Sequence, residues 1–151
     1  MVDTIWRWAK RTPVQSFILC PIAIIVVELL QFGKVTLVPW GAALLVWGYL
    51  QYRLTGNYRH PLAGGSSGMT TPPDRLIESG PYRFTRNPMY LGLVLVTLGI
   101  ALCAGVWPMF LAPVATFATA NWAHIPFEEA KMRRQFGADF EAYTSKVRRW
   151  I

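Results

Sequence analysis

The stretch SGPYRFTRNPMYLG, residues 79–92, leads without interruption into an apolar run that ends at Leu102. It places Arg83 and Arg86 among aromatic and proline residues at the start of an apolar helix. Arginine and aromatic side chains are typical of the boundary between a bilayer and water. The junction therefore predicts a binding site for a polar ligand at the mouth of a membrane helix.

The composition outside this stretch indicates a small helical membrane protein. The chain has 151 residues, of which 53% are hydrophobic and 15% charged, so we expect a single domain over 1–151 that is embedded in lipid. The net charge of +7 does not favour nucleic-acid binding, because the basic residues lie between apolar runs rather than along one polar face. Cys20 and Cys103 both lie in apolar runs, which favours neither a disulfide nor a metal site.

Four apolar runs predict an all-α bundle with transmembrane helices at about 13–32, 35–52, 89–104 and 106–122. We expect an interfacial helix at 1–12, a cytosolic loop at 53–88 and an amphipathic cytosolic helix at 127–146. Glu28 is either a functional group at membrane depth or a side chain that reaches the interface. The basic residues gather on one side, which predicts a multi-pass protein of a bacterial inner membrane with both termini in the cytoplasm.

Two spaced blocks carry a resemblance to a known family. The first comprises residues 80–83 and 86–92, and the second comprises Ile125 to Glu129, Phe136, Gly137, Tyr143 and Val147 to Trp150. Together they resemble the motifs of the isoprenylcysteine carboxyl methyltransferase and phospholipid methyltransferase superfamily of integral membrane enzymes. One position departs from that pattern, since Asn87 stands where the family usually has histidine, and this puts a proton-transfer role there in doubt.

The resemblance implies S-adenosylmethionine as the methyl donor and a lipophilic acceptor that arrives from the membrane. Arginine suits the donor's carboxylate, glutamate its ammonium or ribose, and aromatic side chains its adenine. The catalytic candidates are Arg83, Arg86 and Asn87. The candidates for binding the cofactor are Tyr82, Arg86, Asn87, Pro88, Tyr90, Leu91, His124, Glu128 and Glu129. No metal site is predicted.

Simpler interpretations stay open for each candidate. The arginines could anchor headgroups, Tyr90 and His124 could be interfacial residues, Glu128 could stabilise a helix start, and Glu129 could pair with Arg133 one turn on. For the whole chain, the alternatives are a non-catalytic membrane scaffold or a lipid-binding protein, while the length argues against a sterol-reductase-like enzyme. The acceptor could be an isoprenylcysteine carboxylate, a phospholipid amine or a small hydrophobic molecule, and a homo-oligomer is compatible with so small a bundle.

Overall fold

The computed structural model describes residues 41–64, 73–105 and 107–151, and the single positions 18, 22, 25, 26, 29, 30 and 33. The predicted interfacial helix at 1–12 and most of the predicted span at 13–32 lie outside the described residues, as do Glu28 and Cys20.

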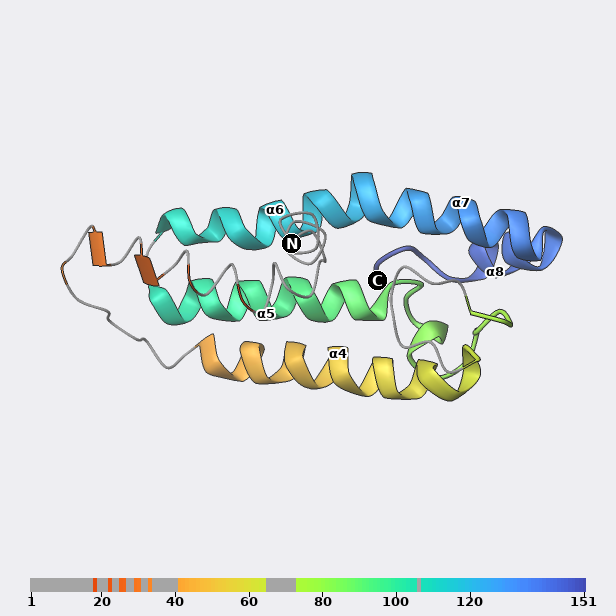
Figure 1. The fold of residues 1–151 in the computed structure, drawn as a ribbon, viewed down its shortest axis with the longest axis horizontal. Helices are drawn as coiled ribbons and strands as arrows, with labels where there is room; N and C mark the ends of the chain where they lie inside the picture. Colours follow the sequence, from red (N-terminus) through yellow and green to blue (C-terminus); the bar gives the residue numbers. More distant parts are fainter. Residues whose placement is uncertain are drawn as a thin grey trace, which may run out of the picture. The chain divides into compact units, whose positions relative to one another are not determined.

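Every regular element that the structure describes from Gly41 onward is helical (Figure 1). The α-helices are α4 (Ala42–Leu62), α5 (Pro88–Ala104), α6 (Leu111–Thr119), α7 (Ile125–Phe136) and α8 (Ala138–Lys146). Between them lie the 3-10 turns η3 (Gly80–Arg83) and η4 (Trp107–Phe110) and the π-helical turn η5 (Ala120–His124). The described residues contain no strand, so the predicted all-α class is confirmed.

Within the part of the chain that the structure describes, no helix is at once long enough and apolar enough to cross a bilayer. The four-span arrangement is therefore not confirmed and stays a prediction.

The helices differ from the predicted segments in three places. Helix α4 starts at Ala42 and continues to Leu62, well into the predicted loop, because polar residues end an apolar run without ending a helix. The predicted helix at 127–146 is divided at Gly137, whose φ of 50° lies in the left-handed region. The predicted span at 106–122 is η4, α6 and η5 in succession, and Pro108 and Pro113 lie in the first turns of η4 and α6, where proline is tolerated.

The chain forms two compact units. Residues 1–49 and 93–116 make up the first, and residues 50–92 and 117–151 make up the second. Helices α4 and α5 each contribute to both units.

In the first unit, glycine allows α4 and α5 to approach closely. A Cβ atom built on Gly99 of α5 would lie 2.7 Å from the Cα atom of Leu45 in α4, so no larger residue fits there without movement of the backbone. A small buried cluster of Ala101, Ala104 and Met109 lies at the end of α5 and in η4. Among the described residues of this unit, small side chains thus allow a close contact between α4 and α5.

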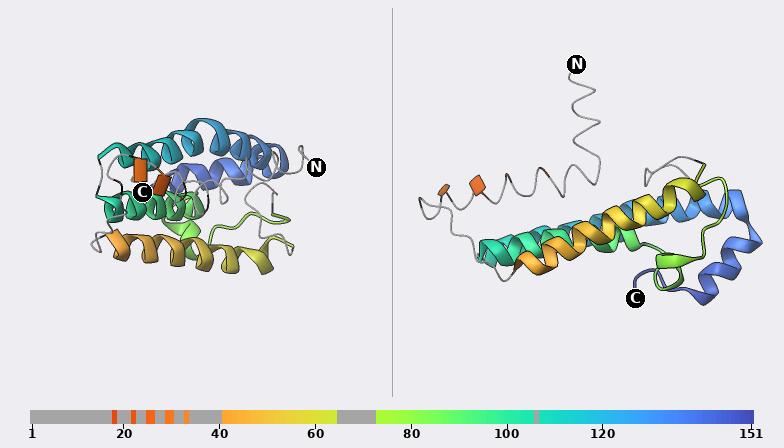
Figure 2. Two further views of the ribbon diagram at one scale, coloured as in Figure 1. Left: turned by 60° about the vertical axis from the view of Figure 1, so that its left-hand side comes forward. Right: turned by 90° about the horizontal axis from the view of Figure 1, so that it is seen from below.

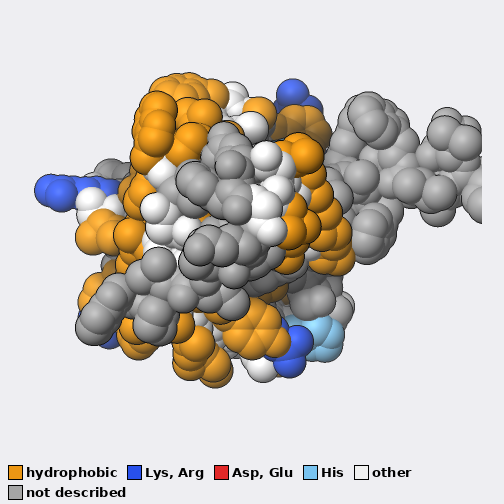
Figure 3. Space-filling model, turned by 90° about the vertical axis from the view of Figure 1, so that its left-hand side faces the viewer, with side chains coloured by type: hydrophobic (Ala, Val, Ile, Leu, Met, Phe, Trp, Pro, Cys, Tyr) orange, Lys and Arg blue, Asp and Glu red, His pale blue; other side chains and the backbone are white. Residues whose placement is uncertain are grey.

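Large hydrophobic side chains are exposed on the first unit. Among them are Trp47 at 62%, Trp107 at 78%, Leu111 at 63% and Val114 at 63% exposure. Figure 3 shows hydrophobic side chains over much of the described surface on the face that it presents. An apolar surface of this kind is compatible with contact with lipid.

The second unit places the turn η3 beside α8 (Figure 2). The Tyr143 hydroxyl of α8 donates to the backbone carbonyl of Tyr82 in η3 over 2.8 Å. Ile125, Phe140 and Tyr143 are buried, and they fix α7 and α8 in this unit. The first turn of α5 belongs to the same unit, so both sequence motifs lie within it.

Candidate functional site

A cavity opens within the second unit, between the two sequence motifs. Its walls come from α4, the segment 73–77, η3, the start of α5, α7 and α8. The predicted site residues in this lining are Tyr82, Arg86, Asn87, Pro88, Tyr90, Glu128 and Glu129. The structure thus brings residues that are about forty positions apart in the sequence to one place.

Backbone features peculiar to glycine and proline shape the wall that carries the arginine motif. Gly80 has a φ of 60°, and a Cβ atom there would lie 2.7 Å from Cζ of Tyr58, so only glycine fits. Pro81 is the second residue of η3 and Pro88 is the first residue of α5, positions at which a missing N–H costs little. Tyr82 and Arg86 are consequently presented on a short, stiff segment between two fixed helix starts.

The first direct link between the motifs joins Tyr90 of α5 to Glu128 of α7. The Tyr90 hydroxyl donates to Oε1 of Glu128 over 2.7 Å. His124 stacks on Tyr90 with ring centroids 6.2 Å apart and planes 17° from parallel. These contacts place the Glu128 carboxylate at the cavity with one of its oxygens already bonded.

Burial raises the pKa of the Glu128 carboxyl to about 7. The hydrogen bond from Tyr90 and the charges of Arg59 and Lys131 act in the opposite direction, because each favours the ionised form. Burial also raises the pKa of Tyr82 to about 12, so this phenol stays neutral near pH 7. Glu128 is therefore a group of the cavity that changes charge near neutral pH.

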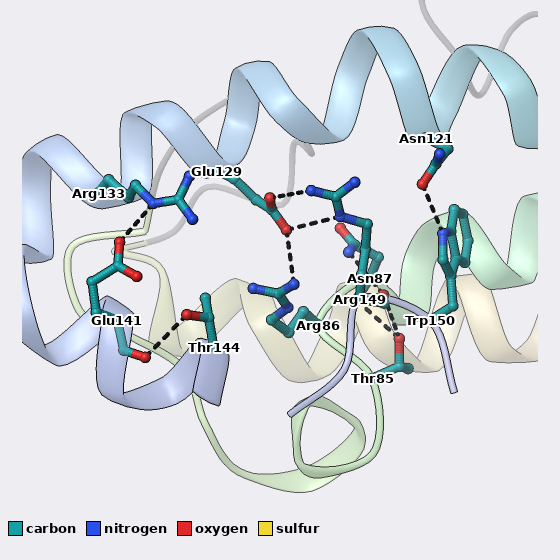
Figure 4. Close-up of polar contacts among 10 residues, drawn as sticks. All are labelled: Thr85, Arg86, Asn87, Asn121, Glu129, Arg133, Glu141, Thr144, Arg149 and Trp150. Atoms are coloured by element: carbon teal, nitrogen blue, oxygen red, sulfur yellow. Dashed lines mark hydrogen bonds and ion pairs between the residues drawn. The ribbon is translucent and has the colours of Figure 1, made fainter. Parts of the chain in front are cut away.

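The second link is a cluster of charges around Glu129 (Figure 4). Arg149 contacts this carboxylate twice, from Nη2 to Oε2 over 2.6 Å and from Nε to Oε1 over 3.2 Å. Nη2 of Arg86 lies 3.3 Å from Oε1. The side chains of Arg86 and Glu129 are only 13% and 9% exposed, so this ion pair is largely shielded from water.

One hydrogen-bond donor of Arg86 has no partner among the described residues. Among the described residues, its Nε is a buried side-chain nitrogen without a hydrogen-bond partner. A buried N–H without an acceptor is costly unless a ligand supplies one. Arg86 also lines the cavity, and an anionic or carbonyl oxygen is the kind of group that would satisfy this donor.

Asn87 has a different partner from the one that the sequence suggested. Its Nδ2 donates to the backbone carbonyl of Arg149 over 3.0 Å, and Oγ1 of Thr85 donates to the same carbonyl over 3.1 Å. This amide is therefore engaged with the C-terminal tail, although Asn87 also lines the cavity.

Three predicted site residues lie outside the lining of this cavity. Arg83 is exposed on η3, Leu91 is half-buried in α5, and His124 meets the site only through its stacking on Tyr90. The alternative pairing of Glu129 with Arg133 is not realised, since Arg133 instead bonds Glu141 over 2.6 Å. Glu129 instead contacts Arg86 and Arg149.

Several residues of the site were not predicted from the sequence. Arg149 lies in a tail that was included in the second motif but was given no role, and its neighbours Arg148 and Trp150 marked the segment as unusually rich in arginine and tryptophan. The cavity also includes the previously unassigned residues Arg59, Lys131, Met132, Phe140 and Tyr143. Of these, Tyr143 had the clearest signal, because it was part of the motif.

A comparison with known protein families shows to which family the chain belongs. The family model described as phospholipid methyltransferase matches residues 32–139. The chain belongs to this family. Its matched region includes the cavity-lining residues of α4, α5 and α7, whereas the C-terminal tail lies beyond it.

Individual relatives match shorter stretches of this phospholipid methyltransferase family member than the family model does. It is 33% identical over 79 residues to a probable protein-S-isoprenylcysteine O-methyltransferase of Oryza sativa, in both the indica and the japonica subspecies. That match covers 48% of this chain and 38% of the rice protein, so the chain spans well under half of the relative's length. It is also 33% identical over 63 residues to an uncharacterized protein of Haemophilus influenzae, which is covered completely. No solved structure matches the chain.

Proposed function

We propose that the protein transfers a methyl group from S-adenosylmethionine to a lipophilic acceptor at a membrane surface. The observation that carries this proposal is the cavity of the second unit, where Arg86 offers an unpaired buried donor and Glu128 a carboxylate that is bonded to Tyr90. The family supports methyl transfer, and its name and that of the rice relative support a lipid or an isoprenylated acceptor.

The residues of the cavity fit the polar groups of the donor. The unpaired Nε of Arg86 suits the donor's carboxylate, because a guanidinium forms charge-assisted hydrogen bonds to carboxylate oxygens. Glu128 has an oxygen beyond the one that accepts from Tyr90, and its ionised form suits the ammonium group or the ribose hydroxyls. The two ends of a zwitterionic amino acid would thus meet opposite charges.

Apolar side chains complete the fit. Tyr82, Met132 and Phe140 line the cavity and offer the flat, apolar contacts that adenine requires. The bound donor supplies a methyl group already activated by its sulfonium, so the protein contributes binding, alignment of the acceptor and exclusion of water. We assign these tasks to Arg86, Glu128 and the aromatic side chains.

The acceptor is proposed only as a class. An isoprenylcysteine carboxylate, a phospholipid amine and a small hydrophobic molecule all combine an apolar body with a methylatable O, N or S atom. The exposed Trp47, Trp107 and Leu111 support an approach from lipid. We accordingly place the protein in a membrane, with the predicted four spans and the motifs at the cytosolic face.

Calorimetric titration of purified protein with S-adenosylhomocysteine, the demethylated donor, tests the site. Arg86→Ala and Glu128→Ala should each weaken binding by about 10- to 100-fold, the effect of losing one hydrogen bond to a charged group. Arg134→Ala is the matched control, because Arg134 is exposed on α7, and it should bind like the wild type. Wild-type protein with no affinity for this compound would overturn the proposal.

The acceptor is tested by incubating the protein with donor labelled in its methyl group and a total membrane lipid extract. A labelled lipid species should appear with wild-type protein and not with Arg86→Ala. Binding of donor without labelling of any species would instead favour a non-catalytic scaffold.

A further inference from the structure

The backbone of the C-terminal tail, residues 147–150, is held by residues 85–87. The Arg86 N–H donates to the carbonyl of Arg148 over 3.0 Å. Thr85 and Asn87 both donate to the next carbonyl, that of Arg149. The three consecutive residues 85–87 therefore bond two consecutive carbonyls of the tail, which fixes the course of the tail beside the cavity.

The end of the tail has a second attachment. Nε1 of Trp150 donates to Oδ1 of Asn121 in η5 over 3.0 Å, and the Trp150 ring lies 4.8 Å from that of Phe117. A segment bonded at both ends loses much of its freedom. The side chain of Arg149, which lies between the two attachments, is thereby aimed at Glu129 (Figure 4).

Arg149 contacts the Glu129 carboxylate at more points than Arg86 does. Its two contacts hold both carboxylate oxygens, whereas Arg86 has one longer contact of 3.3 Å to Oε1. A guanidinium that meets a carboxylate at two points restricts its orientation as well as its position. The position of the Arg86 guanidinium therefore depends on Glu129, and the position of the Glu129 carboxylate depends on Arg149.

The charges of this cluster do not balance. Two guanidinium groups share one carboxylate, and the side chains of Arg86, Glu129 and Arg149 are 13%, 9% and 34% exposed. One arginine would suffice to neutralise Glu129, and a surplus cation is costly where water is scarce. The surplus, together with the unpaired Nε of Arg86, favours a ligand anion in the cavity.

We propose that Arg149 is a positioning residue, which acts through Glu129 to direct the Arg86 guanidinium at the anionic end of the ligand, and that Asn87 serves this role by holding the tail. The inference rests on the proposed function, because the anion is taken to be the carboxylate of the methyl donor. It assigns Asn87 to the tail rather than to the reacting atoms. The C-terminal tail thus supports the binding site from outside, since none of its residues lines the cavity.

Two ligands separate this role from a merely structural one. S-adenosylhomocysteine carries the carboxylate, and 5′-methylthioadenosine has the same nucleoside without it. Arg149→Ala should weaken binding of the first by about tenfold or more and leave binding of the second unchanged, because only the first uses Arg86. Arg148→Ala is the matched control, since it removes an exposed neighbouring arginine and keeps the backbone carbonyl.

The double variant Arg86→Ala/Arg149→Ala should bind S-adenosylhomocysteine no more weakly than Arg86→Ala alone, because Arg149 acts through Arg86. Asn87→Asp, which replaces the donating amide by an acceptor of the same shape, should shift the indole ¹⁵N–¹H resonance of Trp150 and weaken the same ligand. The resonance is assigned with Trp150→Phe.

The outcomes distinguish the two proposals. Wild-type protein that binds neither compound overturns the proposed function and this inference with it. Wild-type binding that Arg149→Ala leaves unchanged, or weakens equally for both ligands, overturns the positioning role alone and leaves the proposed function standing.

Discussion

The hydroxyl of Tyr90 donates to Oε1 of Glu128 over 2.7 Å and so joins the first turn of α5 to the first turn of α7. The bond favours the ionised carboxylate, whereas burial favours the neutral acid and raises the pKa of Glu128 to about 7. The charge of the cavity near neutral pH therefore depends on this contact.

Tyr90→Phe should raise the pKa of Glu128 further, because it removes a hydrogen bond that lowers it. If the ionised carboxylate binds the ammonium of S-adenosylhomocysteine, affinity rises with pH through this pKa, and the midpoint should move to higher pH in the variant. Titrations between pH 6 and pH 9 measure the midpoint. Tyr58→Phe, which removes a hydroxyl bonded to Ser79 outside the cavity, should keep the wild-type midpoint, and equal midpoints in all three proteins would contradict the prediction.

Glu129→Gln should destabilise the second unit by about 3 kcal/mol, the typical effect of leaving a buried ion pair without one partner. It removes the negative charge between Arg86 and Arg149 in a site where the carboxylate is only 9% exposed. Thermal unfolding followed by circular dichroism measures the loss. Glu141→Gln is the control, since its pair with Arg133 is exposed and should contribute far less. A similar loss in both variants would show that burial does not strengthen the Glu129 cluster.

The positions of several helix starts and breaks could be predicted from the sequence because proline and glycine act locally. Pro88 starts α5 and Pro126 lies in the first turn of α7, each within a residue or two of the predicted start. Gly105, with a φ of 68°, follows the last residue of α5. The family resemblance suggested that Arg86, Glu128 and Glu129 belong to one site. Which of these side chains contact each other is decided only when the chain folds.

The role of the tail could not be predicted, because its partners are remote in sequence. Asn87 and Thr85 lie 62 and 64 positions from the Arg149 carbonyl that they bond, and no local pattern encodes such a contact. The extension of α4 was missed for another reason. The hydropathy of a segment indicates whether it lies in lipid or in water, and it does not indicate whether the segment is helical. The break at Gly137 interrupts an apolar periodicity that continues on both sides.

Glu128→Gln should change the pH dependence of stability. The carboxyl titrates near 4.5 in the unfolded chain and near 7 in the folded protein, so between these values the folded state holds the extra proton. The free energy of unfolding of the wild type therefore falls as pH rises through this window and levels off above it. The variant lacks this titration, so its melting temperature relative to the wild type should be higher at pH 8 than at pH 5. A difference that does not vary with pH would contradict the raised pKa.

Gly99→Ala should weaken the contact of α4 with α5 in the first unit. The added methyl group would lie 2.7 Å from Cα of Leu45, and backbone cannot yield as a flexible side chain can, so a loss of about 1–3 kcal/mol is expected. Gly56→Ala is the matched control, because Gly56 also lies within a helix but its added carbon would meet only Cε of Met89, at 3.7 Å. Alanine is the better helix former, so this control should unfold at the same or a higher temperature than the wild type. Gly99→Ala protein that is as stable as Gly56→Ala would mean that the two helices do not approach as closely as the structure places them.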